Sequence, residues 1–459
     1  MRLVSLGRFV FVLALVSGGV LSTAAQERIV IKAGRLLDGT GSPAIENGVI
    51  VVKGDRIEAV GSASSVPIPK DARTIDLSND TVMPGMINGH DHPTIRAYTG
   101  IGEVNSLVQQ LNEMAEPPVM QATRGVRDLR VDLLSGVTTE YLVGETGYND
   151  LYLKQMANAG VFPAPRIYPS GPWIMPTGGY APIPETNGPW AMRVMVRKNT
   201  EAGAHHIKIL VSNEMASGPN AGRPYPPKGT NFTKEELDAV IDEVHRLGMK
   251  VTAHAIDTDS IRFALEGGAD SIQHADGLTP EIDDLFLKRK ASIVNTYVAM
   301  LQASFTPQDF HFLDAEANSP QEWVNHARSL VDQVIAKNQK LWLLGDPLQD
   351  YLKKRYAQLK LAKDKGVPIA VGTDNMQGLL DLEIEHLVNA GFTPLEAISA
   401  ATGTGAKALG IEQEVGTLQK GKFADIISVK GKPDQDIHDL SKINFVMVGG
   451  VSYSGLSFR

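Results

Sequence analysis

The chain of 459 residues contains no cysteine, so it has no disulfide bond, no thiol nucleophile and no cysteine ligand for a metal. Basic residues are not in excess: the formal net charge is −8, and no basic block matches a phosphate backbone, which argues against a nucleic-acid partner. Internal repeats and low-complexity tracts are also missing. The chain has 43% apolar residues, 21% charged residues, 44 glycines and 26 prolines. This composition is that of an ordinary globular protein with many turns, long enough for one large and one small domain.

Long apolar runs are scarce, and the clearest one lies near the start of the chain. Residues 1–25 hold a short basic region, "MRLVSLGR", an apolar stretch, "FVFVLALVSGGVL", and the small residues "STAA". The apolar stretch is short for a membrane span but normal for a secretory signal peptide. We therefore expect export to the periplasm or the medium, with cleavage near Ala25. An uncleaved membrane anchor is the alternative. Removing Arg2 and Arg8 with this segment would leave a net charge of −10.

The rest of the chain divides by its pattern of apolar residues. Short β-like segments with Gly and Asn turns occupy residues 26–82, and a similar texture returns in residues 409–459. Between them, residues 83–408 alternate apolar strand-like runs with helical segments, which is typical of a parallel sheet. We predict an α/β fold: a (β/α)8 TIM barrel with a small β-sandwich built from both chain ends. Residues 301–360 are richly helical and are expected to form an insertion between two late strands.

Polar residues stand at the ends of five of these apolar runs, where barrel active sites assemble. The run "VMPGMINGHDH" ends in two histidines one residue apart, which an extended strand points to the same side. The complete set is His90, His92, Lys208, His254, His274 and Asp374. Imidazole and carboxylate groups in this number suit one or two divalent cations, and zinc in particular.

Lys208 is the unusual member of this set, because it lies among Ile207, Ile209 and Leu210. A buried ammonium group is costly, and it would repel a cation. One interpretation is a lysine that reaches solvent or pairs with a carboxylate. The other is a neutral amine that has reacted with carbon dioxide, which gives an anionic carbamate able to bridge two metals.

These motifs resemble the amidohydrolase superfamily of metal-dependent hydrolases, and within it the secreted branch of Xaa-Pro dipeptidases and ochratoxin-type amidases. The matching segments are "VMPGMINGHDH", "GVTTE", "GAHHIKIL", "VTAHA", "SIQHA", "VGTDN" and "VGTLQKGKFADIISV". The resemblance covers essentially the whole chain after the expected signal peptide.

The resemblance implies a role for each polar residue. Its implied ligands are His90, His92 and Asp374 for one metal ion and His254 and His274 for a second. Carboxylated Lys208 would bridge the two ions, which are expected to be zinc. A water between them would become a bridging hydroxide, and Asp374 would accept its proton and pass it to the leaving nitrogen. Asp374 and His274 are therefore the candidate catalytic residues.

The chain departs from the family pattern at positions near the substrate. Asn88 stands where the branch usually has Asp. Asp91 should face away from the histidines and form a hydrogen bond or pack behind them, and it is not expected to be a metal ligand. In "PTGGY", Tyr180 replaces a histidine that often touches substrate, so Tyr180 is the candidate substrate-binding residue. The segment from Tyr168 to Trp190 is expected to be a long loop, with Trp173 and Trp190 either walling the pocket or packing on the barrel rim.

The remaining histidines are expected to be structural or exposed. His206 should be packed and hydrogen-bonded in the core, and His205 is also interpreted as structural. His245 and His386 lie in helical segments and are predicted to be on helix surfaces. His311, His326 and His438 have no strand-end context and receive no role.

The expected function is hydrolysis of amide (C–N) bonds in dipeptides or N-acyl amino acids. The same fold and metals could instead act on cyclic amides, as imidazolonepropionase-like enzymes do, or on lactones, esters or phosphotriesters. A bridging lysine favours two metals but does not separate these substrates. A non-catalytic, metal-stabilised envelope protein is the alternative from another class. The expected partner is a small-molecule substrate, with no membrane span after signal removal. The exact substrate, the native metal and homo-oligomerisation stay open.

Overall fold

The structure is a computed structural model that describes residues 27–95, 115–177, 186–212, 230–301, 305, 307–338, 347–453 and 455–456. The expected signal peptide, residues 1–25, and Tyr180 both lie outside the described residues. Within the described ranges, no helix has the combination of length and hydropathy that crossing a membrane requires.

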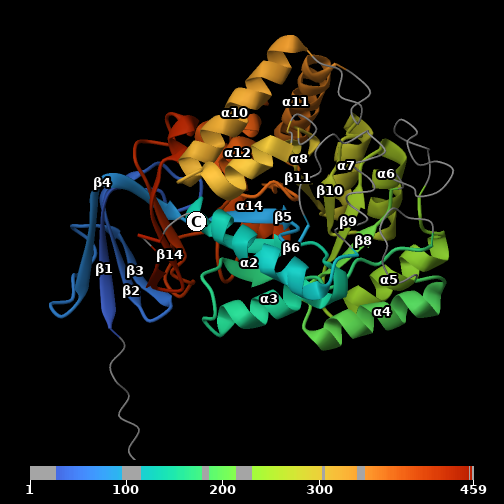
Figure 1. Cartoon of the computed structure of the whole chain (residues 1–459), viewed down its shortest axis with the longest axis horizontal. Helices are drawn as coiled ribbons and strands as arrows, with labels where there is room; N and C mark the ends of the chain where they lie inside the picture. Colours follow the sequence, from blue (N-terminus) through green and yellow to red (C-terminus); the bar gives the residue numbers. More distant parts are fainter. Residues whose placement is uncertain are drawn as a thin grey trace, which may run out of the picture.

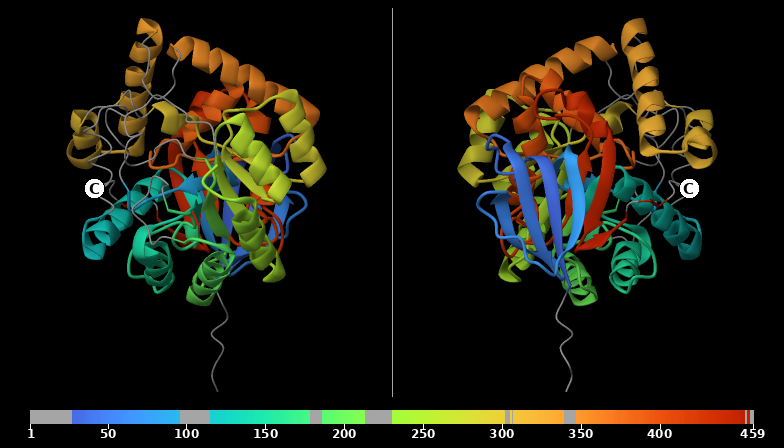
Figure 2. Two further views of the ribbon diagram at one scale, coloured as in Figure 1. Left: turned by 90° about the vertical axis from the view of Figure 1, so that its right-hand side faces the viewer. Right: turned by 90° about the vertical axis from the view of Figure 1, so that its left-hand side faces the viewer.

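A seven-stranded sheet joins the two ends of the chain. Its order is β15-β14-β13-β4-β1-β2-β3, and strands from both ends lie side by side in it (Figure 2). The strands are β1 (Arg28–Leu36), β2 (Ile45–Lys53), β3 (Arg56–Ser62), β4 (Arg73–Pro84), β13 (Ile426–Val429), β14 (Ile443–Val448) and β15 (Val451–Ser452). Strand β4 is the junction, because it pairs with β1 in parallel and with β13 in antiparallel orientation. Ile29 and Ile31 pack in one apolar cluster with Ile426 and Met447, so burial of apolar surface holds the ends together.

Eight further strands form two parallel sheets, of order β5-β6-β7 and β12-β11-β10-β9-β8. The strands are β5 (Met86–Asp91), β6 (Val137–Leu142), β7 (Arg166–Tyr168), β8 (Ile207–Leu210), β9 (Val251–Ala255), β10 (Ser271–His274), β11 (Ser292–Asn295) and β12 (Ile369–Val371). Nearly all of their residues are buried, as expected for parallel strands covered by helices. The predicted α/β class with parallel sheets is confirmed.

Backbone hydrogen bonds also connect the two parallel sheets along both of their outer strands. On one side, Ile174 N donates to Lys208 O (3.0 Å) and Leu210 N donates to Ile174 O (3.2 Å). On the other, Asp374 N donates to His90 O (2.8 Å) and His92 N donates to Asp374 O (2.9 Å). This second connection brings Asp374 beside the two histidines of β5, although they lie at opposite ends of the α/β segment.

Helices alternate with the parallel strands and cover them (Figure 1). Those that follow β5 to β10 are α2 (Pro118–Leu134), α3 (Asn149–Asn158), α4 (Pro189–Ala202), α5 (Lys234–Arg246), α6 (Thr258–Gly267) and α7 (Pro280–Arg289). Between β11 and β12, in the predicted helical insertion, lie α8 (Tyr297–Leu301), α9 (Pro307–His311), α10 (Pro320–Lys337) and α11 (Leu348–Lys365). After β12 come α12 (Leu380–Asn389), α13 (Pro394–Ala400) and α14 (Gly403–Leu409). Short η turns occur at η1 (Thr146–Tyr148), η3 (Phe312–Glu316) and η5 (Ile437–Ser441).

Local sequence determines where some of these helices begin, and α5 is an example. Helix α5 begins at a capping box, in which the Thr233 side chain accepts from Glu236 N and the Glu236 carboxylate accepts from Thr233 N. The largest apolar cluster then unites the parallel strands, their helices and one face of the seven-stranded sheet, which contributes Met83 and Val446. The strand ends are therefore held on a continuous packed core.

Candidate metal centre

Three of the six predicted residues end or follow a parallel strand, and the other three, His90, His254 and Lys208, lie within one. His90 is in β5, His254 in β9 and His274 is the last residue of β10. His92 follows β5, and Asp374 follows β12. The four histidines and Lys208 are buried, with exposures of 1% for His90 and for Lys208. Because the strands are parallel, their carboxyl ends meet, and the sequence order of the residues becomes one spatial cluster.

The imidazole rings and the carboxylate of Asp374 form a continuous chain of contacts. His90 Nε2 lies 3.3 Å from His92 Nε2 and 3.6 Å from Asp374 Oδ2. The ring centroids of His90 and His274 are 4.7 Å apart, and those of His274 and His254 are 4.6 Å apart. His274 is thus the ring that connects His254 to the other residues of the cluster.

Hydrogen bonds to Nδ1 orient three of these rings. His90 Nδ1 donates to Gln273 Oε1 (2.6 Å), and His92 Nδ1 donates to the carbonyl oxygen of Gly144 (2.7 Å). His274 Nδ1 is 2.7 Å from Thr296 Oγ1. When Nδ1 carries the proton, Nε2 keeps its lone pair and can bind a metal. Sequence reasoning missed these partners, although Gln273 directly precedes His274 in "SIQH".

The electrostatics favour neutral imidazoles. Burial lowers the pKa of His90 and of His274 well below its usual value, and the charge of Lys208 lowers both further. Burial and then Lys208 lower the pKa of His92 to about 3. Lys208 thus acts electrostatically on three imidazoles, and its strand β8 pairs with β9, the strand of His254. Burial raises the pKa of Asp374 to about 6, against the opposing effect of Lys208.

The backbone at two of these positions is strained. His274 has φ of 69° and Asp374 has φ of 63°, in the left-handed region that non-glycine residues seldom occupy. Such conformations persist where surrounding contacts impose them, and they gather at functional sites. Around His274 the contacts come from Arg355 of α11, which donates to the carbonyl oxygens of His274 and Ala275. No local sequence feature marks Arg355 as part of the site.

The donor set fits a metal. One ligand atom each from His90, His274 and Asp374 lies within 4.8 Å of the other two. Neutral ring nitrogens together with a carboxylate are the ligands that zinc prefers in proteins without cysteine ligands. A second group, Asp91, Asp132 and Glu140, meets the same distance criterion but offers only oxygens.

Several other predicted residues are placed differently. Trp173 is buried, with its ring centroid 5.5 Å from that of His92, so it lines the centre. Trp190 belongs to α4 and is 78% exposed, so the expectation that it walls or packs against the site is wrong. The reason is that the expected loop ends where α4 begins at Pro189.

Among the remaining histidines, His206 is buried and its ring stacks on that of Tyr141 with centroids 3.7 Å apart, as expected of a packed core residue. The expected hydrogen bond is not formed with the described residues, because neither ring nitrogen has a hydrogen-bond partner there. The prediction that His386 lies on a helix surface is wrong, because it is only 3% exposed. Its Nδ1 is 2.7 Å from the hydroxyl of Tyr356, which α11 places against α12. Helix α11, which precedes β12, therefore covers the face of α12 that the sequence pattern predicted to be exposed.

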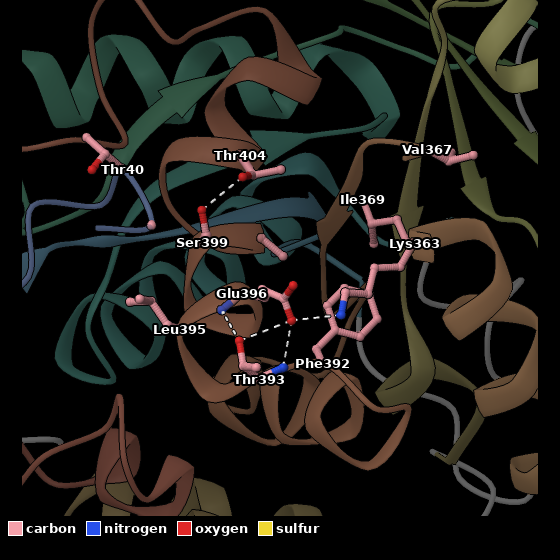
Figure 3. A pocket seen from close by; sticks show the side chains of 12 residues that line it. Thr40, Lys363, Val367, Ile369, Phe392, Thr393, Leu395, Glu396, Ser399 and Thr404 are labelled. Carbon is pink, nitrogen blue, oxygen red and sulfur yellow. Dashed lines mark hydrogen bonds and ion pairs between the residues drawn. The ribbon is translucent and has the colours of Figure 1, made fainter. Parts of the chain in front are cut away.

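A surface pocket of about 390 Å³ lies at the other end of β12 from the metal centre (Figure 3). Its lining includes Ile369, the first residue of β12, together with Phe392, and an ion pair between Lys363 and Glu396 (2.8 Å) closes one side. Asp374 instead follows the last residue of the same strand. This pocket is therefore separate from the metal centre.

Comparison with known proteins agrees with this site. The amidohydrolase family profile matches residues 81–452. Ochratoxinase from Aspergillus niger is 26% identical, over 95% of this chain and 88% of its own length. A 5-methylthioadenosine/S-adenosylhomocysteine deaminase from Symbiobacterium thermophilum is 25% identical, over 90% of this chain and 89% of its own. The crystal structure of a Xaa-Pro dipeptidase with bound methionine in the active site has a TM-score of 0.71 and 27% identity, covering 94% of this chain and 100% of that one. The chain therefore belongs to the amidohydrolase family and is a hydrolase that acts on carbon–nitrogen bonds.

Proposed function

We propose that this chain is a binuclear metal-dependent amidohydrolase that cleaves amide bonds of dipeptides or N-acyl amino acids. The observation that carries the proposal is the meeting of four imidazoles and Asp374 at the carboxyl ends of the parallel strands, with Lys208 buried in β8 beside the strand of His254. The similarity to proteins named ochratoxinase and Xaa-Pro dipeptidase supports an amide substrate that contains an amino acid.

The proposal includes the architecture that the family implies. We infer that the two parallel sheets close into one (β/α)8 barrel over residues 83–408, and the backbone hydrogen bonds on both sides of the sheets support this. Residues 26–82 and 409–459 would form the second, β-sandwich-like domain around the seven-stranded sheet.

We assign the ligands as the motifs suggest. The residues that would hold the ions are His90, His92 and Asp374 for the first and His254 and His274 for the second, with carboxylated Lys208 shared between them. When bound, two divalent ions, expected to be zinc, would polarise the scissile carbonyl and supply a water that is acidic near neutral pH. Gln273 and Gly144 fix the rings of His90 and His92 by accepting from Nδ1.

Asp374 is the proposed proton carrier. Its carboxylate lies 3.6 Å from His90 Nε2, beside the proposed ions, where it would accept a proton from the water and pass it to a leaving nitrogen. His274 is the second candidate catalytic residue, because it connects His254 to His90 and its backbone is held in a strained conformation. Thr296 and Arg355 keep this histidine in place.

The carbamate on Lys208 follows from its surroundings. Lys208 is 1% exposed, and it acts electrostatically on His90, His92 and His274, three imidazoles whose lowered pKa values favour the neutral form. A protonated amine there would oppose cation binding, whereas a carbamate would supply two oxygens and a negative charge. The chemical surroundings therefore favour the modified side chain once metal is present.

A second candidate is hydrolysis of a C–N bond in a ring or on a heterocycle. The deaminase from Symbiobacterium thermophilum supports it, since that protein aligns with 90% of this chain. A panel of Xaa-Pro dipeptides, N-acyl amino acids, cyclic amides, aminopurine nucleosides, lactones and phosphotriesters separates these functions. Release of free amino acid supports the first proposal. Turnover confined to another class rejects it, and no turnover by metal-loaded protein favours a non-catalytic envelope protein.

Elemental analysis and one variant test the centre itself. We expect about two zinc-class ions per chain in wild-type protein. Lys208→Ala should lose metal and activity, and short carboxylic acids in the buffer should restore part of both. Lys234→Ala removes an exposed lysine on α5 and is the matched control. Unchanged metal content and rate in Lys208→Ala would exclude the bridge.

Export is a separate proposal, based on residues 1–25. Amino-terminal sequencing of protein recovered outside the cytoplasm should begin near Gln26, and a start at Met1 would reject cleavage. Size-exclusion chromatography with light scattering would give the oligomeric state.

A further inference from the structure

The side of β5 that faces away from the histidines carries a second group of acidic residues. Asp91 ends β5 between His90 and His92, and alternation along the strand directs it to the opposite face. There it meets Glu140 of β6 and Asp132 of α2, with one oxygen of each within 4.8 Å of the other two. All three residues have 0% exposure.

Most of the oxygens in this group have no hydrogen-bond donor among the described residues. Asp91 Oδ1 accepts from Gln377 Nε2 (2.9 Å), and Asp132 Oδ1 accepts from Gly378 N (2.7 Å). The other oxygens accept nothing from the part of the chain that the structure describes: Asp91 Oδ2, Asp132 Oδ2 and both oxygens of Glu140. Glu140 is thus a completely buried carboxylate, turned towards two others, with neither oxygen bonded. Such a group is costly unless a cation or a proton compensates it.

Within the described ranges, basic side chains supply only part of this compensation. Arg127 forms an ion pair with Asp128 on the same helix and offsets only part of the charge of Asp132. Among the described residues, no ion pair is formed by Asp91 or Glu140. Burial raises the pKa values of all three carboxyl groups, that of Asp132 to about 8. Repulsion from Asp132 raises the pKa values of Asp91 and Glu140 further, and repulsion from Asp128 does so for Asp132.

We propose that Asp91, Asp132 and Glu140 form a third cation site, which binds a hard, oxygen-preferring divalent ion such as Ca²⁺, Mg²⁺ or Mn²⁺. Two oxygens that bind one Ca²⁺ ion, each about 2.4 Å from it, can be at most roughly 4.8 Å apart. One oxygen from each of the three carboxylates lies within 4.8 Å of the other two, so all three can reach a single ion. The absence of imidazole separates this site chemically from the histidine centre, where nitrogen ligands favour zinc.

A cation at this site would also restrain the backbone of the histidine centre, from the opposite face of β5. Gln377 and Gly378, which donate to Asp91 and Asp132, belong to the segment that follows Asp374. Gly378 has φ of 80°, and a Cβ on it would lie 2.9 Å from Val131 of α2, so the segment is packed tightly against that helix. A cation held there would link β5, β6, α2 and the chain after Asp374 in one cluster.

Metal-free protein prepared with a chelator provides the test. We expect Ca²⁺, Mg²⁺ or Mn²⁺, titrated separately by calorimetry, to bind at one ion per chain and to raise the unfolding temperature. Asp374→Asn disrupts the histidine centre and should keep this response. Glu140→Gln should weaken the binding at least 100-fold. Asp150→Asn removes a buried carboxylate outside the group, one that accepts from backbone amides, and is the matched control.

Two results would overturn the proposal. One is an equal cation response in Glu140→Gln and wild type. The other is wild-type protein that binds none of the three ions between pH 6 and pH 8, which would show that the carboxyl groups share protons instead. Elemental analysis of wild type and Asp374→Asn after exposure to each ion keeps the test decisive even if Glu140→Gln does not fold. Retention of one such ion by both proteins supports the site, and its loss from both rejects it.

Discussion

Replacement of Arg355 tests whether a buried guanidinium holds His274 in its strained conformation. Arg355 is 1% exposed and donates to the carbonyl oxygens of His274 and Ala275, and to Asn295 Oδ1 (2.8 Å). It also pairs with Asp276 at 3.3 Å. Arg355→Met keeps the apolar stem but leaves three buried acceptors without this donor. Each buried acceptor left without a donor costs about 1–3 kcal/mol, and the surrounding structure can relax in part. We therefore expect the free energy of unfolding to fall by about 4 kcal/mol.

Urea unfolding of metal-free protein, followed by tryptophan fluorescence, measures this loss without a contribution from bound metal. Arg355→Lys keeps the charge but has a single ammonium group, so we expect about half the effect. Lys354→Met removes an exposed charge from the same helix and controls for the change in net charge. The metal affinity of Arg355→Met should also fall, by roughly 10–100-fold, because the turn that positions His274 relaxes. A loss of stability below about 1 kcal/mol with full metal content would refute the reasoning.

Three further predictions concern neighbours of the site. Gln273→Leu removes the acceptor for the buried Nδ1 of His90 and should weaken metal binding roughly 10–100-fold, measured with a competing zinc chelator. The free energy of unfolding of metal-free protein should fall by about 1–3 kcal/mol, the cost of one buried donor left without its acceptor. Gly372→Ala places a Cβ 2.5 Å from His90 Cβ and 2.6 Å from His90 N. The substitution should therefore destabilise the protein by about 1–3 kcal/mol and lower its metal content. Wild-type stability and metal content would mean that β5 and the chain after β12 can move apart to make room. Burial lowers the pKa of His386 to about 4, so the unfolded chain binds a proton that the folded chain excludes as the pH falls from about 6.5 to 4. The stabilising contribution of the neutral ring is lost over this pH range. The difference in free energy of unfolding between wild type and His386→Gln should therefore shrink by up to about 3 kcal/mol as the pH falls. A difference that does not change with pH would contradict this prediction.

Much of the site could be predicted because its pattern is local. Each ligand follows a short apolar run, and in parallel strands such a position is directed to the carboxyl end of the sheet. The spacing of His90 and His92 also implied that Asp91 faces the other way. These inferences need only the two-residue repeat of a strand and the alternation of strands with helices.

Other features depended on which helix covers which strand, and periodicity does not encode that. Asp91 was expected to make a hydrogen bond behind the histidines, and it accepts one from Gln377, but its approach to Asp132 and Glu140 follows from the packing of α2 against β5 and β6. His386 was predicted to be exposed because its own helix offers a polar face there, yet α11 brings Tyr356 over it.

The sequence by itself therefore determined the chemical identity of the candidate ligands, their order along the chain and the α/β class, since these follow from residue types and short-range alternation. Only the tertiary structure decided the tautomers of His90 and His92, the clamp formed by Arg355 and the burial of three carboxylates behind β5. Each of these depends on atoms brought together from distant segments, and free energies of burial and hydrogen bonding are set by that three-dimensional environment.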